Sequence, residues 1–463
     1  MSAKSVDAGR DLTQGALLPK ILLFTLPLIA TGILQLLFNT ADTVVVGRWG
    51  GETPEAREAA LAAVGSCGAL INLIINLFFG LSVGAGVCAA QELGARHYDE
   101  VKKTVHTSIL TALICGAILT VVGFVLARPL LTLMGTEPEV LDEAVPYMRA
   151  YFLGAPANIV YQYCAAILRS AGDTTHPLVY LSIAGAVNVG LNLVMVLAFG
   201  LGALGVGIAT AAAQWISCIL IVIHMIRRTD ACRLEPRELR IDPQKLRKIV
   251  AVGIPAGLQG VIFSASNVLI QSSVNSFGKA TVAANTAASN VLDYIYTAMN
   301  ALYHAALTFV GQNLGAQNYR RVKRSVLCCV GTVTVVGLTV GGLVILFGRP
   351  LLGIFAPGNE AVVEIGMVRL QILASTYFLC GIMEVGSGVL RGCGKSLQAM
   401  IISLIGSCVT RIIWIYTVFA ATHSFAVLFW CYPLSWLLTL SAHFIFAFLT
   451  LRRMERQTAA LPA

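Results

Sequence analysis

The segment QELGARHYDEVKKTV (residues 91–105) recurs as QNLGAQNYRRVKRSV at residues 312–326, and this repetition decides the fold. Eight of the fifteen positions are identical at a constant offset of 221, and the same offset carries RPLL at 128–131 onto RPLL at 349–352. Spacing that is preserved over such a distance indicates a duplicated structural unit. In a strongly apolar chain, duplicated halves are typical of a transporter whose site lies between or within them.

Composition and hydropathy place the chain in a membrane. Of its 463 residues, 57% are hydrophobic and 12% are charged, whereas a soluble domain carries about 25% charged residues. The mean hydropathy is +0.79. Apolar stretches long enough to span a bilayer as helices recur throughout, and they lack the alternation of barrel strands. We therefore predict an all-α integral membrane protein, because helices satisfy their own backbone groups in lipid.

We predict twelve transmembrane helices in two six-helix bundles. The predicted spans are 16–47, 56–92, 98–128, 138–170, 174–200, 203–227, 245–277, 281–314, 319–348, 360–392, 396–420 and 424–451. Six spans return the chain to its starting side, so the halves are expected to be parallel repeats. This gives an N-terminal lobe at 1–227, a cytoplasmic connector at 228–244 and a C-terminal lobe at 245–463.

The basic residues predict the orientation. Of the 32 Lys and Arg residues, 24 lie on one predicted side and 5 on the other, and Arg149, Arg369 and Arg411 lie inside spans. By the positive-inside rule, both termini and the connector are cytoplasmic in a multi-pass protein of the cell membrane. The net charge of +9 is thus a topology signal with some contact to anionic lipid, and it does not indicate nucleic-acid binding.

Several function classes lack their motifs. The 12 cysteines form no C-x-x-C pair, and no histidine cluster has metal-ligand spacing along the chain. No P-loop, paired histidines or serine nucleophile with a plausible base is evident. We expect neither an enzyme nor a metal site, and nothing resembles the selectivity filter of a channel.

Three acids lie deep inside the predicted spans: Asp42, Asp293 and Glu384, with Arg411 as the deepest base. A charge at the centre of a bilayer costs about 2.5–3.5 kcal/mol on insertion scales, so such residues usually face a cavity and serve function. We interpret the three acids as cation-coupling groups.

Other polar residues follow the acids at helical spacing, which predicts a polar cavity in each half. In the first half these are Gln35, Asn39, Asn158, Gln162, Asn188 and Asn192. In the second half they are Ser264, Asn267, Gln271, Thr297, Asn300, His304 and Tyr377, together with Arg411.

The repeat and the bases leave a structural alternative open. Asp293 falls on Asn72 of the first half and Glu384 falls on Gln162, so the charge patterns of the two lobes differ. Asp293 and Glu384 could pair with Arg411 as a buried network that only fixes helix register.

The order and spacing of several motifs resemble one known family. Besides the opening repeat, these are FNTADTVVVG (38–47), ILRSAGD (167–173) and VLRGCGK (389–395). Together they resemble the multidrug and toxic compound extrusion (MATE) family over nearly the whole chain, in the form of its bacterial members.

The resemblance implies a secondary antiporter with two bundles in a V, which expels amphipathic, often cationic drugs in exchange for H⁺ or Na⁺. We expect a functional monomer without a cofactor other than the coupling ion. The family's helix 1 aspartate corresponds to Asp42, and Pro27 corresponds to a proline near which bending is expected. Asn192 stands where many members carry a second aspartate.

The alternative is a flippase for a lipid-linked saccharide or a similar lipid-like precursor. Such a substrate is anionic, and it would favour a cavity rich in Arg and Lys. Three deep acids against one deep base favour a cationic substrate instead.

Overall fold

A computed structural model describes residues 11–459, and every regular element in that range is a helix. The prediction of an all-helical chain is therefore confirmed. In the first half of the sequence the elements are α1 (Leu17–Trp49), α2 (Pro54–Gly94), α3 (Tyr98–Leu133), α4 (Pro138–Ser170), α5 (Thr175–Leu193), η1 (Val194–Ala198), α6 (Gly202–Arg227) and η2 (Pro236–Glu238). Lys4 and Arg10, which contribute to the predicted orientation, lie outside the described residues.

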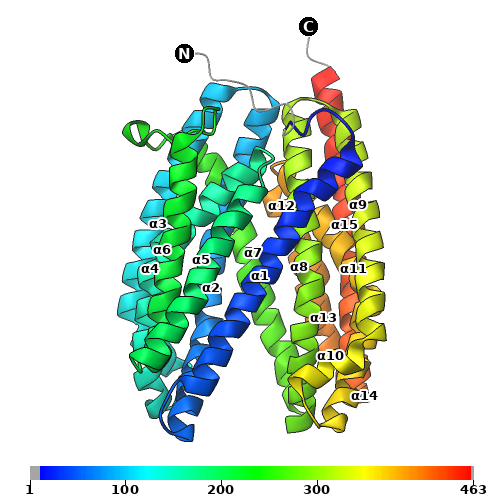
Figure 1. The fold of residues 1–463 in the computed structure, drawn as a ribbon. Helices are drawn as coiled ribbons and strands as arrows, with labels where there is room; N and C mark the ends of the chain where they lie inside the picture. Colours follow the sequence, from blue (N-terminus) through cyan, green and yellow to red (C-terminus); the bar gives the residue numbers. More distant parts are fainter. Residues whose placement is uncertain (1–10, 460–463) are drawn as a thin grey trace. The chain divides into compact units, whose positions relative to one another are not determined.

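The second half repeats this order with more interruptions (Figure 1). Its elements are α7 (Pro243–Asn275), α8 (Lys279–Gly315), α9 (Tyr319–Leu346), α10 (Gly348–Phe355), α11 (Glu360–Gly392), α12 (Ser396–Ser403), η3 (Leu404–Val409), α13 (Thr410–Trp414), η4 (Ile415–Phe419), α14 (Ala420–Thr422) and α15 (Phe425–Ala459). The predicted span 396–420 is thus divided by the two π-helical segments η3 and η4, which shift the helical register within one apolar stretch.

Ten helices of the described chain are long and apolar enough to cross a membrane, which makes this a multi-pass membrane protein. Two long helices, α4 with 33 residues and α8 with 37 residues, are not among the ten. They carry polar residues along their length, including Asn158 on α4 and Asp293 on α8. The total of twelve spans therefore stays a prediction.

The duplicated motif folds in the same way in both halves. Helix α2 ends at Gly94 and α3 begins at Tyr98, and at an offset of 221 α8 ends at Gly315 and α9 begins at Tyr319. Arg96 and Gln317, in the two connecting turns, both adopt the left-handed conformation, with φ of 58° and 55°. This conformation is uncommon for residues other than glycine, so the turn geometry has been kept although the residue has changed.

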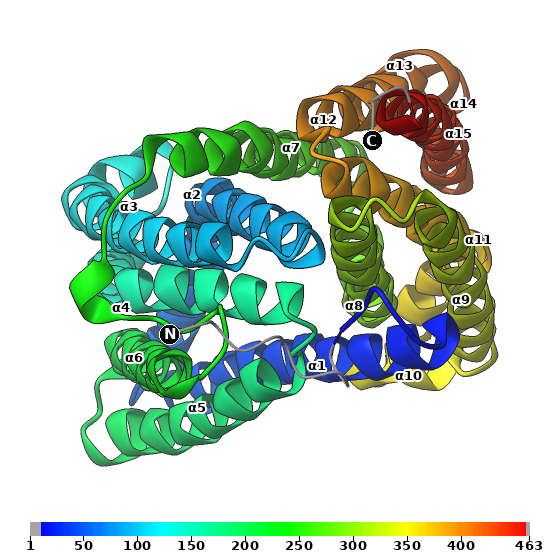
Figure 2. The ribbon, with the colours of Figure 1, turned by 90° about the horizontal axis from the view of Figure 1, so that it is seen from above.

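The chain divides into two compact units, which we call unit 1 (Ala30–Gly257) and unit 2 (Leu12–Ile29 with residues 258–459). In unit 1, α4 packs against α2, α3 and α6, as Figure 2 also shows. In unit 2, α11 has the equivalent central position and packs against α8, α9 and α15. Each unit therefore has its own hydrophobic core around one central helix.

Helices α1 and α7 are each divided between the units. Phe24 and Leu28 of α1 belong to the core of unit 2, whereas Val45 and Val46 of the same helix belong to the core of unit 1. The division falls after Ile29 in α1 and after Gly257 in α7. Pro27 and Pro255 each lie two residues before that point. Proline removes a backbone hydrogen bond inside a helix, so the ladder of hydrogen bonds is interrupted near the division in both helices.

Glycines let α7 approach α2 within unit 1. A Cβ on Gly80 would lie 2.1 Å from the nitrogen of Gly257, and a Cβ on Gly84 would lie 2.2 Å from the oxygen of Ile249. A Cβ on Gly253 would in turn lie 2.5 Å from the Cα of Leu81. Small residues four apart on both helices thus bring the two backbones into contact.

The repeated motif holds the start of a divided helix in each unit. In unit 1, Lys245 near the start of α7 pairs with Glu92 and lies 2.7 Å from the Glu100 carboxylate. In unit 2, the position equivalent to Glu100 is Arg321, and its guanidinium donates to backbone oxygens of the residues before α1. These acceptors are the carbonyls of Leu12 at 3.2 Å, Gln14 at 2.7 Å and Gly15 at 2.8 Å.

Candidate functional site

The side chain of Asp42 is half-buried and hydrogen bonded to two other helices of unit 1. The Asn192 amide on α5 donates to the Asp42 carboxylate, and Thr210 on α6 is a second hydrogen-bonding partner. Asn192 also donates to Asn188 Oδ1 at 3.3 Å, and Asn188 donates to Thr210 Oγ1 at 3.4 Å. The four side chains form a polar network around one carboxylate.

Local packing brings α1 and α5 together at this point. A Cβ on Gly185 of α5 would lie 1.8 Å from the ring of Phe38, so only glycine admits this ring. Asp42 follows Phe38 by one helical turn, and Asn188 and Asn192 follow Gly185 by about one and two turns. The π-helical segment η1 begins directly after α5, and such segments are frequent at functional sites.

The surroundings of this network are polar and aromatic. Tyr151 of α4 hydrogen bonds Asn158 and Gln214, and the charge of Asp42 acts on Tyr151 and on the neighbouring Tyr147. Asn192 is fully buried, yet its Oδ1 has no hydrogen-bond partner. A buried acceptor without a partner is costly, so this oxygen can accept a donor or coordinate a cation beside Asp42.

The acids of unit 2 lie near arginines. The charge of Arg369 acts on Asp293, and the charge of Arg391 acts on Glu384. The Asp293 side chain is exposed, whereas Glu384 is half-buried. Burial of a base near each acid reduces the net charge that the polar region of unit 2 offers to a cation.

Arg369 is the most heavily bonded of these bases. It is 8% exposed, and its Nη1 donates at 2.6 Å to the carbonyl and the side-chain oxygen of Asn285 and to Ser289 Oγ. The guanidinium also lies over the ring of Phe429, 4.8 Å from its centroid. These contacts fix the cation against α8.

Two further arginines of unit 2 are buried on aromatic rings. Arg391 donates to Tyr303 Oη at 2.6 Å and to Gln259 Oε1 at 2.8 Å. Arg411 donates to Ser435 Oγ at 3.2 Å and lies 4.1 Å from the ring centroid of Tyr432. The sequence left open a buried network in which Asp293 and Glu384 pair with Arg411. In the structure the charges that act on these acids are those of Arg369 and Arg391.

The remaining predicted cavity residues differ in their contacts and exposure. Gln271 belongs to a network, since it donates to Asn275 at 2.9 Å and accepts from Asn285, the partner of Arg369, at 2.8 Å. Ser264 and Thr297 donate to carbonyls of their own helices, whereas Gln35, Asn39 and Asn267 are exposed. Gln162 is half-buried, and Asn300 hydrogen bonds Tyr296. The His304 ring lies edge-on to the Tyr303 ring, and Tyr377 is buried against Trp436.

Several residues of these networks are not among the predicted site residues, including Thr210, Gln214, Arg369 and Arg391. Thr210 and Gln214 stand four residues apart in an otherwise apolar stretch of α6, and this spacing is the signal that could have identified them. Arg369 and Arg391 were interpreted as a span residue and a topology residue, because basic residues near span ends usually mark orientation. Nothing in the sequence shows that both are buried.

The fold and this site define a multi-pass, all-helical membrane protein built from two repeated units with a half-buried acid in the first. The chain belongs to the MatE family, whose family model matches residues 27–194 and 255–417.

Curated relatives and solved structures resemble the chain over most of its length. The chain is 26% identical to the "Probable multidrug resistance protein YoeA" of Bacillus subtilis, with 82% of each chain covered. It is 24% identical to the "FAD transporter" of Shewanella oneidensis, with 81% of this chain and 82% of the relative covered. A structure described as the outward-facing conformation of a multidrug resistance MATE family transporter matches with a TM-score of 0.90, 20% identity, and coverage of 98% and 100%.

Proposed function

We propose that the chain is a secondary active antiporter that exports amphipathic organic cations in exchange for inward-moving H⁺ or Na⁺. The observation that carries this proposal is the half-buried Asp42 carboxylate, whose hydrogen-bond partners Asn192 and Thr210 are neutral. A carboxylate in a span that is balanced only by neutral groups attracts a cation more strongly than one with a fixed base beside it. Membership of the MatE family and the multidrug resistance proteins among its relatives support the same function.

Coupling follows from mutually exclusive occupancy of this carboxylate. An H⁺ or Na⁺ at Asp42 also reaches the unpaired Oδ1 of Asn192, and it neutralises the charge that holds a cationic drug. The drug therefore leaves when the ion binds, and the ion leaves when the drug binds. The exchange of one monovalent cation for one cationic drug moves no net charge, so the inward concentration gradient of the ion drives it. Each tenfold step of that gradient, about 1.4 kcal/mol, sustains a tenfold gradient of the drug.

Unit 2 takes a secondary part in this proposal. Asp293 and Glu384 are proposed as further cation-coupling groups, and the charge of an arginine acts on each and limits its attraction for cations. Pro27 is proposed as a hinge, since it lies near the point where α1 is divided between the units. The asymmetric basic residues support a place in the cell membrane with both termini cytoplasmic. We also propose a functional monomer.

A second candidate is export of an amphipathic anion, such as a lipid-linked saccharide precursor or a dinucleotide. Three buried arginines of unit 2, Arg369, Arg391 and Arg411, favour it, because guanidinium groups bind phosphate and carboxylate. The FAD transporter among the relatives transports a substrate of this charge. The partners already bound by these arginines in the protein argue against free binding capacity.

Transport in proteoliposomes with separately imposed gradients tests the proposal. Ethidium and FAD serve as the cationic and anionic probes, and a pH gradient and a Na⁺ gradient are applied one at a time. We expect gradient-driven ethidium transport by the wild type and none by Asp42→Asn. Asp142→Asn, the same change at an exposed position, should transport like the wild type.

Two results would contradict the proposal. Normal coupled transport by Asp42→Asn would remove this residue from the mechanism. Transport of FAD but not of ethidium, with loss on Arg391→Gln, would support the anionic alternative.

A further inference from the structure

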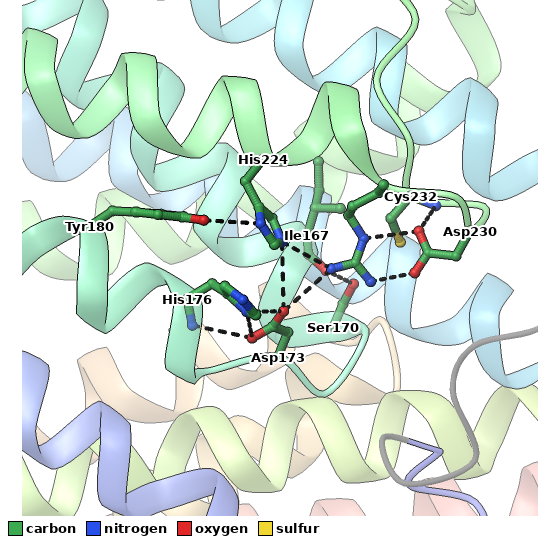
Figure 3. A network of polar contacts seen from close by, with 9 residues as sticks. Ile167, Ser170, Asp173, His176, Tyr180, His224, Asp230 and Cys232 are labelled. Atoms are coloured by element: carbon green, nitrogen blue, oxygen red, sulfur yellow. Dashed lines mark hydrogen bonds and ion pairs between the residues drawn. The ribbon is translucent and has the colours of Figure 1, made fainter.

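A cluster of two histidines and one aspartate lies in unit 1 away from the Asp42 network (Figure 3). Asp173 belongs to the turn between α4 and α5, His176 to the first turn of α5, and His224 to the last turn of α6. The segment that follows α6 adds Arg228 and Asp230. Two segments of the chain, residues 173–176 and residues 224–230, therefore converge on one position.

The nitrogen and oxygen atoms of this cluster converge closely. His176 Nδ1 lies 2.9 and 2.8 Å from the two oxygens of Asp173, and His224 Nε2 lies 3.9 Å from Asp173 Oδ2. One ligand atom from each residue can be chosen so that all three lie within 4.8 Å of one another. The Asp173 side chain is 1% exposed, whereas the rings of His176 and His224 are 37% and 19% exposed, which leaves a path for an ion.

A cationic group already contacts these atoms. Arg228 Nη1 lies 3.3 Å from Asp173 Oδ2 and 3.4 Å from His224 Nε2. The other side of the same guanidinium is held by Asp230, which accepts from Arg228 Nε at 2.9 Å and from Nη2. The lone pairs of the carboxylate and the imidazole are therefore directed at a positive charge, and Asp230 can retain Arg228 when it is displaced.

The orientation of His224 is fixed from outside the cluster. Its second ring nitrogen, Nδ1, lies 3.0 Å from the hydroxyl of Tyr180. In metal sites the ligating histidine commonly has its other nitrogen hydrogen bonded, which sets the tautomer and the ring orientation. Tyr180 supplies this contact here.

We propose that Asp173, His176 and His224 form a binding site for a divalent transition-metal ion such as Zn²⁺, which replaces Arg228 Nη1. Zinc–ligand bonds of about 2.0–2.2 Å in a tetrahedron place the ligand atoms about 3.4 Å apart. The distances from Asp173 to the two histidines lie on either side of that value, so small side-chain movements complete the site with water as the fourth ligand. Two imidazoles favour zinc, nickel or copper over magnesium and calcium.

Titration of the purified full-length protein, with any affinity tag removed, tests this site. Zn²⁺ is added in competition with a chromophoric chelator, and Mg²⁺ serves as the control ion. We expect one saturable Zn²⁺ site per chain and a loss of about 10-fold or more in affinity for His176→Ala and His224→Ala. His97→Ala, at an exposed histidine outside the cluster, should bind like the wild type.

Arg228→Gln distinguishes a metal site from a purely structural ion-pair network. Removal of the competing guanidinium should tighten Zn²⁺ binding, whereas the histidine substitutions weaken it. X-ray absorption of the zinc-loaded wild type should show two imidazole ligands. Absence of a saturable site, or equal affinity in the wild type and His176→Ala, would overturn the proposal. The readout is binding alone, so the result is independent of the transport function.

Discussion

The two units differ in the groups that surround the acids of their predicted spans. In unit 1 the half-buried Asp42 is held by the neutral groups of Asn192 and Thr210. In unit 2 the two acids lie within reach of the charges of Arg369 and Arg391. One ancestral scaffold thus holds an acid among neutral groups in one copy and acids beside bases in the other.

Under the proposed antiport function, the difference favours unit 1 as the copy that binds the coupling cation. A buried base offsets part of the charge of a nearby acid. An acid that is surrounded by amides and hydroxyls keeps its attraction for a mobile cation. We therefore assign the main coupling step to unit 1 and a secondary or structural part to the acids of unit 2.

The largest expected effect separates the acids of the two units. Asp42→Asn should lower coupled ethidium transport to background, roughly 100-fold or more, while Glu384→Gln should lower it no more than about 10-fold. Initial rates in proteoliposomes, normalised to the reconstituted protein, measure both. An equal loss in the two variants would break the comparison and place the coupling step in both units.

Exchanging the carboxylate and the amide between residues 42 and 192 tests the role of unit 1 more closely. The double variant Asp42→Asn with Asn192→Asp keeps one carboxylate and one amide in the same pair of positions. We expect it to recover about a tenth of wild-type transport or more, because the charge stays in the network. Asn192→Asp in the wild-type background is the matched control. A double variant as inactive as Asp42→Asn would show that the helix carrying the acid matters.

The glycine contact in unit 1 should be the most sensitive packing position. Gly80→Ala places a Cβ against the backbone of Gly257 and should destabilise the protein by about 3 kcal/mol or more. Gly68→Ala on the same helix, where a Cβ meets nothing within 4 Å, should be neutral or slightly stabilising. If both variants melt alike, close contact of α2 and α7 is not required.

A thiol-reactive dye suits these melting measurements. Eleven of the twelve cysteines are buried, and Cys328 is partly exposed. Burial raises the pKa of the Cys232 thiol to about 12, so this thiol stays protonated and unreactive at neutral pH until the protein unfolds.

The contacts of Lys245, which hold the start of α7, should stabilise the protein more than those of Arg321, which hold the segment before α1. Lys245→Met leaves Glu92, whose side chain is 12% exposed, without its base and should cost about 2–3 kcal/mol. Lys103→Met removes an exposed lysine that pairs with Glu100 on the same helix, and it should cost no more than about 0.5 kcal/mol. Equal melting of the two variants would show that the buried pair does not hold α7.

The smallest effect is expected at Arg321 of unit 2, which corresponds to Glu100 of unit 1. Arg321 donates to three backbone carbonyls in a partly exposed place, so Arg321→Gln should cost about 1–2 kcal/mol. The neighbouring Arg320→Gln, at an exposed position, is the control. A larger loss of stability for Arg321→Gln than for Lys245→Met would contradict this ranking.

Much of the fold was predictable from apolar length and from the repeat. The predicted span 138–170 coincides with α4, and the repeat identified two turns with the same backbone conformation. The π-helical segments in the span 396–420 were not predictable, because they change the register within a uniformly apolar stretch. The division of α1 between the units was not predictable either, since the residues that join the two cores, Phe24 and Leu28 before it and Val45 and Val46 after it, are all apolar.

The candidate site was predictable as a set of polar faces and not as a network. Helical spacing placed Asp42 on α1 and Asn192 on α5, but 150 residues separate them. Their meeting depends on the packing of Phe38 against Gly185, which no local pattern reveals. Arg391 illustrates the opposite error, since a residue interpreted as an orientation signal is 6% exposed and bonded to Tyr303.

The amide of Asn192 across from Asp42 has an evolutionary consequence. Asparagine and aspartate codons differ by one base, so a single nucleotide change would give unit 1 a second carboxylate over a hydrogen bond that already exists. Lineages can therefore pass between one-acid and two-acid versions of the site without rebuilding any helix contact. Under the proposed function, one substitution can change the ion preference while the scaffold that carries the site stays the same.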